Sequence, residues 1–132
     1  MRTYAVAYVV ALIVLAACDF VWLSTMGAGV YRPRLGGLLL ERPVLWAAVL
    51  FYLVYAAGAV VFAVAPALEA PSWLRAAGMG ALFGLFAYAT YDLTNLATLR
   101  GWSITVTVLD IGWGAVLTAI GATAGYAAAR FT

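Results

Sequence analysis

The chain has 132 residues, of which 67% are apolar and only 9% are charged. Soluble domains carry about a quarter charged residues, so the composition excludes a soluble globular protein and indicates an all-α integral membrane protein. With no His and one Cys, zinc sites, Ser-His-Asp or Cys-His catalysis and an internal disulfide are excluded, and a net charge of +2 does not suggest nucleic acid as a partner.

Four apolar runs are long enough to cross a bilayer, which takes about 20 helical residues. In chain order they predict transmembrane helices over residues 4–26, 44–64, 72–98 and 103–129. Pro43 and Pro66 bound the second helix, and Ser72 is placed to cap the third. The short connections predict a single domain, residues 1–132, folded as an up-and-down bundle of four transmembrane helices.

The connections hold six of the twelve charged residues. The first, of roughly 17 residues, contains Arg32-Pro33-Arg34, which we expect to form an interfacial turn. Glu41 and Glu69 fall in the first and second connections and are expected to be solvated.

The first apolar run contains Leu15-Ala16-Ala17-Cys18, which has the form of a bacterial lipoprotein cleavage box. The run continues through Phe20, Val21 and Trp22, where a lipoprotein would turn polar. We therefore expect an uncleaved first helix, with acylation of Cys18 as the alternative.

Orientation follows from the arginines. Four of them, Arg32, Arg34, Arg42 and Arg100, lie on the side of the first and third connections, and three, Arg2, Arg75 and Arg130, lie on the side of the termini. This bias favours the first and third connections in the cytoplasm, for a multi-pass protein of the bacterial inner membrane.

Three aspartates lie inside apolar runs, where an ionisable side chain is costly unless it has a partner. Asp19 is about seven residues from the end of the first helix, Asp92 about six from the end of the third, and Asp110 about seven from the start of the fourth. Since neighbouring helices run in opposite directions, all three fall roughly 10 Å below the same membrane surface. We expect them to face one another inside the bundle.

Residues three and four apart share a helix face, and this spacing adds aromatic and amide side chains to the aspartates. The candidate pocket residues are Asp19, Trp22, Tyr52, Tyr55, Tyr88, Asp92, Asn95, Asp110 and Trp113. The cluster fits three roles: a hydrogen-bonded network that fixes helix register, a ligand pocket, and a path for protons or cations. It has no recognised metal-ligand spacing, and no cofactor is indicated.

Small residues form a second pattern on the third and fourth helices. Gly80 and Gly84 are spaced for close helix packing, as are Gly121 and Gly125. These positions could also contact a second copy of the chain or another membrane protein.

Several motifs resemble those of a known family. Asp19-Phe-Val-Trp-Leu23, Tyr91-Asp-Leu-Thr-Asn95 and Asp110-Ile-Gly-Trp-Gly114 are similar to the pattern of the uncharacterised bacterial membrane family called domain of unknown function 2177. The resemblance covers nearly the whole chain. It implies a four-helix integral membrane protein and brings no assigned activity or cofactor.

The sequence thus predicts a small membrane protein whose polar pocket binds a lipid-derived or amphipathic molecule, with membrane lipids as its partners. A proton- or cation-coupled carrier and a structural or assembly subunit are the alternatives. An enzyme acting on a membrane lipid would use a carboxylate as general base and Tyr52 or Tyr88 as donor, but no spacing is diagnostic of one.

Overall fold

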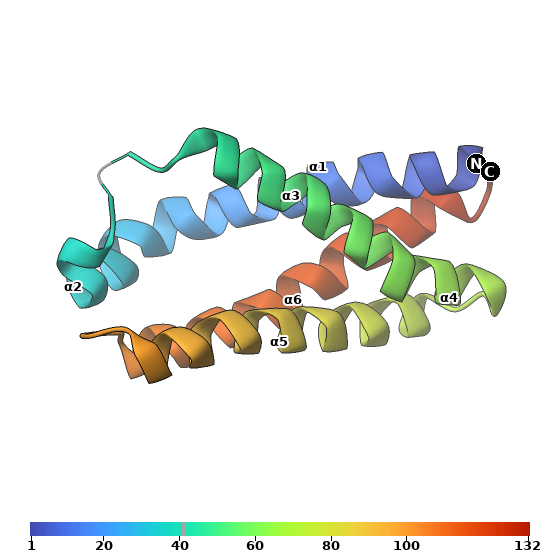
Figure 1. The fold of residues 1–132 in the computed structure, drawn as a ribbon. Coiled ribbons are helices and arrows are strands. Elements are labelled where there is room, and N and C mark those ends of the chain that lie inside the picture. The colour runs from blue at the N-terminus through green and yellow to red at the C-terminus, as the bar shows by residue number, and fades with distance from the viewer. Residues whose placement is uncertain (41) are drawn as a thin grey trace.

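The computed structural model describes residues 1–40 and 42–132, and Glu41 lies outside the described residues. Four long helical segments run back and forth along one direction, and the two termini meet at the same end (Figure 1). The first segment consists of α1 (Arg2–Met26), the π-helical η1 (Gly27–Tyr31), α2 (Arg32–Leu35) and the 3-10 turn η2 (Gly36–Leu38). The second consists of α3 (Leu45–Ala59), the π-helical η3 (Val60–Val64) and α4 (Ala65–Glu69). The third is α5 (Trp73–Thr98) and the fourth is α6 (Ile104–Ala129). The all-α bundle expected from the sequence is confirmed.

The starts of α5 and α6 follow from side-chain caps. The hydroxyl of Ser72 accepts a hydrogen bond from the backbone N–H of Arg75 at 3.2 Å, as the sequence predicts. Ser103 plays the same role for Val106, also at 3.2 Å. Each cap satisfies a backbone donor that the first helical turn leaves free.

Two π turns carry the first two helical segments past their predicted ends. The second helix does not end at Val64, and Arg32-Pro33-Arg34 is helical rather than an interfacial turn. In both places a π segment comes just before a proline, which then occupies the first turn of the next α segment. Proline is tolerated there because that turn needs no N–H donor, and the wider π turn re-registers the hydrogen bonds around it. Both segments therefore extend farther than proline positions alone predict, and Glu69 ends the second one exposed to solvent.

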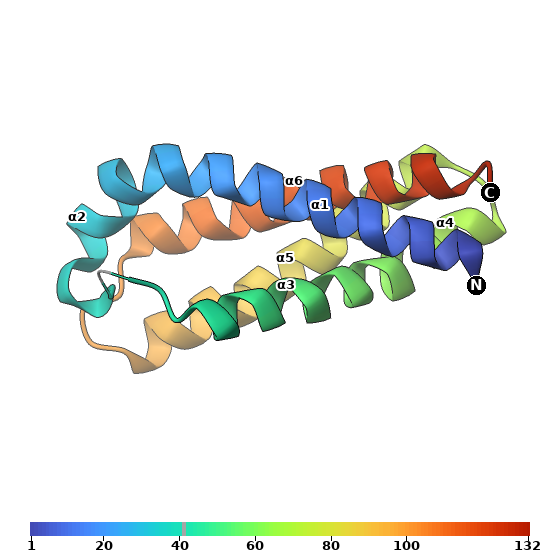
Figure 2. The ribbon, with the colours of Figure 1, turned by 90° about the horizontal axis from the view of Figure 1, so that it is seen from above.

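Three segments within the described part of the chain are long and apolar enough to cross a membrane: residues 2–38, 45–69 and 104–129. α5 has the same length as α6 and packs along it (Figures 1 and 2). Its composition is more polar because it carries Asp92, Asn95 and several Tyr and Thr residues.

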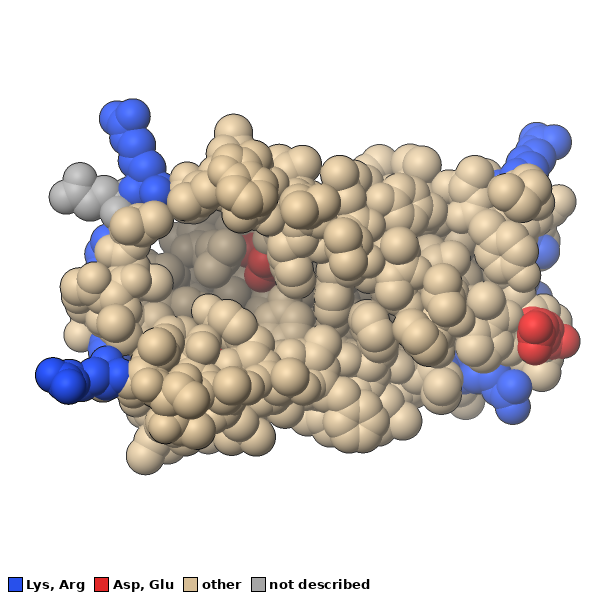
Figure 3. All heavy atoms as spheres, viewed as in Figure 1, with Lys and Arg blue, Asp and Glu red and all other residues tan. Residues whose placement is uncertain are grey.

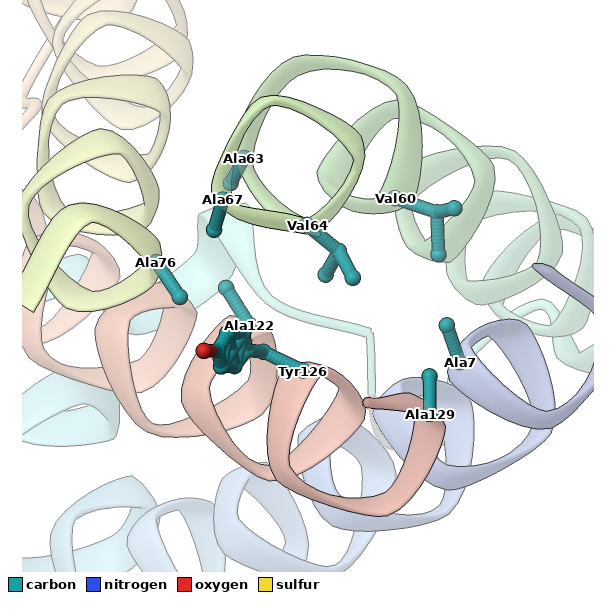
Figure 4. Close-up of a cluster of buried hydrophobic side chains, with 9 residues drawn as sticks. All are labelled: Ala7, Val60, Ala63, Val64, Ala67, Ala76, Ala122, Tyr126 and Ala129. Carbon is teal, nitrogen blue, oxygen red and sulfur yellow. The ribbon is translucent and has the colours of Figure 1, made fainter. Parts of the chain in front are cut away.

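Helix α6 is the centre of the bundle. It packs most extensively against α5 and α1 and has more buried residues than any other element. Close to the termini, α1, α4, α5, η3 and α6 meet in a cluster of mostly small side chains (Figure 4). Its members are Ala7, Val60, Ala63, Val64, Ala67, Ala76, Ala122, Tyr126 and Ala129. Small side chains let helix backbones approach closely, so this end of the bundle is tightly packed.

The four glycines of the small-residue pattern pack within the chain. A Cβ atom at Gly80 would lie 2.7 Å from the carbonyl oxygen of Thr118, and one at Gly84 would collide with the backbone of Gly114. Gly121 packs against the Leu15 side chain, and Gly125 against the α1 backbone. All four are buried, and each faces another helix of the same chain.

Candidate functional site

The three intramembrane aspartates point into the bundle. Asp19 on α1 is 8% exposed, Asp92 on α5 is fully buried, and Asp110 on α6 is half-buried. Each lies in the half of its helix that is nearer to α2 and to the α5–α6 turn. The chain has no Lys or His, and all seven arginines are exposed, with basic side chains visible at both ends of the molecule in Figure 3. No basic side chain is therefore available to neutralise the aspartates.

The Asp19 carboxylate has a hydrogen-bond donor for each oxygen. The Tyr52 hydroxyl, from α3, donates to Oδ2. The indole Nε1 of Trp113, from α6, donates to Oδ1 at 3.0 Å. These bonds tie α1 to two other helices, and they explain how a carboxylate can be held in an apolar setting.

The Asp110 carboxylate is held by a different tyrosine. Tyr31, the last residue of the π segment η1, donates its hydroxyl to Asp110 Oδ1 at 2.9 Å. The same hydroxyl accepts the indole Nε1–H of Trp22 at 3.0 Å. The Trp22 and Trp113 rings stack with their centres 4.5 Å apart and their planes at 4°, so the Asp19 and Asp110 networks share one aromatic stack.

Asp92 differs from the other two aspartates. Among the described residues, neither of its oxygens has a hydrogen-bond partner, although the side chain is completely buried. Its neighbour is the Asp110 carboxyl, which lies close enough to share a hydrogen bond with it when one of the two carboxyls is protonated. A buried, unsatisfied carboxyl is costly, and orphaned groups of this kind occur at functional sites. Asn95, one turn further along α5, is half-buried and makes no side-chain hydrogen bond to the aspartates among the described residues.

A cavity of about 330 Å³ lies beside Asp110. We call it the aromatic cavity, and its lining residues are Phe51 and Tyr55 of α3, Ala87, Tyr88 and Tyr91 of α5, and Asp110 of α6. In Figure 3 the surface is hollowed between α3 and α5, and an acidic side chain is visible at the bottom of the hollow.

The cavity exists because the second helical segment packs on α5 unevenly. Its contact with α5 is concentrated at η3, and towards α2 the helices α3 and α5 diverge (Figure 1). The end near the termini is packed with alanines, whereas bulky aromatic rings lie between the helices here. Tyr55 and Tyr88 meet edge to face at 6.0 Å, and the Tyr55 hydroxyl is hydrogen-bonded to that of Thr118 at 2.7 Å. These contacts hold the walls in place.

The comparison with known families agrees with this architecture. The profile of the family described as "Predicted membrane protein (DUF2177)" matches residues 4–127. The chain belongs to this family. The resemblance seen in its motifs is thereby confirmed, and so is its nature as a membrane protein. No curated protein and no solved structure matches the chain.

Eight of the nine predicted site residues of this DUF2177 member divide into two adjacent groups, and Asn95 belongs to neither. Asp19, Trp22, Tyr52 and Trp113 form the hydrogen-bonded and stacked network, and none of them lines the aromatic cavity. Tyr55, Tyr88 and Asp110 line it, and Asp92 lies behind Asp110. No cluster of three or more metal-binding side chains occurs in the part of the chain described here.

Sequence reasoning missed Tyr31, Phe51 and Tyr91. Tyr31 lay in the predicted first connection. No charged residue occurs between Asp19 and Arg32, and this could have indicated that the first helix continues through Tyr31. Phe51 is four residues before Tyr55, and Tyr91 is four after Ala87, so helical spacing marks both. Both residues are also exposed on the outside of the bundle, 43% for Phe51 and 56% for Tyr91. In the sequence they therefore look like ordinary lipid-facing residues.

Proposed function

We propose that the chain binds an amphipathic, lipid-derived molecule in the aromatic cavity, inside the membrane. The observation that carries the proposal is the cavity itself, which has about 330 Å³ of space, five apolar or aromatic lining residues and one carboxylate. Ligand sites are typically concave and mainly apolar, with a few polar groups that fix orientation, and measure about 300–1,000 Å³. A volume at the low end of this range suits a head group or a short segment of a lipid.

The opening of the cavity favours a ligand that arrives through the bilayer. Phe51 on α3 and Tyr91 on α5 line the cavity and are also exposed on the outside of the bundle. A polar head could therefore reach Asp110 while an attached acyl chain stays among the lipid tails. This path requires no unfolding of the bundle.

The test is retention of native lipid. The protein is purified in a mild non-ionic detergent, and its bound molecules are identified by native mass spectrometry and by extraction. Ala87→Trp fills the cavity from its own wall and should reduce the bound molecule at least about ten-fold. Ala97→Trp makes the same change at an exposed position of α5 outside the cavity and should retain it. Equal retention in both variants would overturn the proposal.

Asp92 favours a second candidate function, a proton- or cation-coupled carrier. A fully buried carboxyl without a donor among the described residues is typical of transport pathways. Flux into proteoliposomes tests this function. Transport that survives Asp92→Asn combined with Asp110→Asn would contradict it.

We propose that the protein lies in the bacterial inner membrane with the α2 end in the cytoplasm. Four arginines belong to that end and three to the end with the termini, which fits the excess of positive charge on cytoplasmic loops. Labelling of single cysteines introduced at Gly37 and at Thr132 of a Cys18→Ala variant, in intact cells and in lysed cells, distinguishes the two orientations.

A further inference from the structure

The walls of the aromatic cavity are unusually rich in π faces. Four of its six lining residues are Phe or Tyr. Phe51 and Tyr55 stack with ring centres 5.3 Å apart, and Tyr88 meets Tyr55 edge to face. The face of an aromatic ring is electron-rich and attracts a cation that lies over it, more strongly when water is excluded.

Among the described residues, the one charged side chain that lines this cavity is that of Asp110, which is acidic. Asp110 uses Oδ1 to accept the Tyr31 hydroxyl. Asp92 lies against it with neither oxygen satisfied. Two adjacent carboxyls in an apolar interior repel when both are ionised, and a nearby positive charge relieves the repulsion.

The chain itself does not supply that positive charge. Its basic residues are all arginines, and each is exposed. A metal ion fits poorly, because hard cations take six or more oxygen ligands and no group of three metal-binding side chains occurs among the residues described. An organic ammonium group needs fewer directed ligands, and it is the species that aromatic walls recognise.

We propose that the aromatic cavity selects a cationic amphiphile, whose ammonium head lies between the rings and Asp110 and whose apolar tail leaves through the opening between α3 and α5. This inference rests on the proposed function and names the chemical class of its ligand. Neutral and anionic amphiphiles of the same length bind more weakly, because they gain no charge interaction and an anion is repelled by Asp110.

Three probes with one tail test the selection. Dodecyltrimethylammonium, dodecanol and dodecanesulfonate carry a positive, a neutral and a negative head. Each is titrated, below its micelle concentration, into the protein in nanodiscs of uncharged lipid, and binding is followed by native mass spectrometry. The cation should bind at least about ten-fold more tightly than dodecanol, and the sulfonate should bind most weakly.

Substitutions locate the selection in the cavity. Asp110→Asn keeps an oxygen to accept the Tyr31 hydroxyl and should reduce the preference for the cation to below about three-fold, with dodecanol binding unchanged. The matched control is Asp19→Asn, which alters a carboxylate outside the cavity and should retain the preference. Tyr91→Leu removes one ring from a partly exposed position and should weaken binding of the cation alone by about three- to ten-fold.

The outcomes separate this inference from the proposed function. If the three probes bind equally to the unmodified protein, or if Asp110→Asn leaves the preference intact, the inference is overturned while a lipid-binding cavity stands. If none of the probes binds and Ala87→Trp has no effect on retained lipid, the proposed function fails as well.

Discussion

Replacing Gly84 with Ala tests how closely α5 and α6 must approach. A Cβ atom at this position would lie 2.6 Å from Thr118 Oγ1, about 0.8 Å short of the 3.4 Å at which ordinary contacts begin. It would lie closer still to the carbonyl oxygen of Gly114. That oxygen belongs to the α6 backbone and has no rotamer into which it can move, so the two helices must separate.

The magnitude follows from this separation. A gap of 0.5–1 Å forfeits about a quarter to a half of the dispersion energy of each contact it opens. Overpacking of this kind typically costs about 1–3 kcal/mol. We expect a loss of about 2 kcal/mol for Gly84→Ala, which is roughly a 30-fold shift of the unfolding equilibrium.

The control lies on the same helix. Gly78 is exposed, and a Cβ atom there would meet nothing within 4 Å. Gly78→Ala should leave stability unchanged or raise it by up to about 1 kcal/mol, because Ala is the better helix former. Unfolding by sodium dodecyl sulfate in mixed micelles, followed by circular dichroism, measures both variants. Equal unfolding midpoints for the two would refute the steric argument.

Two further predictions concern the α2 end of the bundle. Tyr31→Phe removes two hydrogen bonds, one from Trp22 and one to Asp110, and should cost about 1–2 kcal/mol at the usual value of such bonds in membranes. It should also change tryptophan emission, and wild-type stability and emission together would contradict the assigned network. Gly101→Ala places a side chain at a φ of +78° and should cost about 1–2 kcal/mol. Gly37→Ala, at a glycine without positive φ and with open space around it, should cost less, and the same unfolding titration compares them.

Much of the architecture could be predicted from the sequence because it depends on local properties. Apolar runs of about 20 residues specify membrane helices whatever their neighbours are. The Ser72 cap involves only residues three positions apart. Prolines were a less reliable guide, because a π turn before Pro33 or Pro66 keeps the helix going, and no single residue type marks a π turn.

The candidate site could be predicted only in part. That Asp19, Asp92 and Asp110 lie at one depth follows from counting residues at about 1.5 Å each. Counting does not show which donor binds which carboxylate, because the donor and the acceptor are 33, 79 and 94 residues apart in the chain. Tyr31 reaches Asp110 only because η1 extends the first helix beyond its predicted end.

The sequence by itself determined that this chain belongs in a membrane and that three acidic groups lie inside it. Charged residues are so scarce that each one inside an apolar run stands out in the sequence. Insertion into a membrane depends on hydrophobicity, which composition alone reveals. Only the tertiary structure decided that each Asp19 oxygen has a donor, that neither Asp92 oxygen has one among the described residues, and that a cavity opens beside Asp110. Those outcomes depend on how far apart the helices are held, by alanines at one end and by aromatic rings at the other, and interhelical distance is a property of the packed bundle.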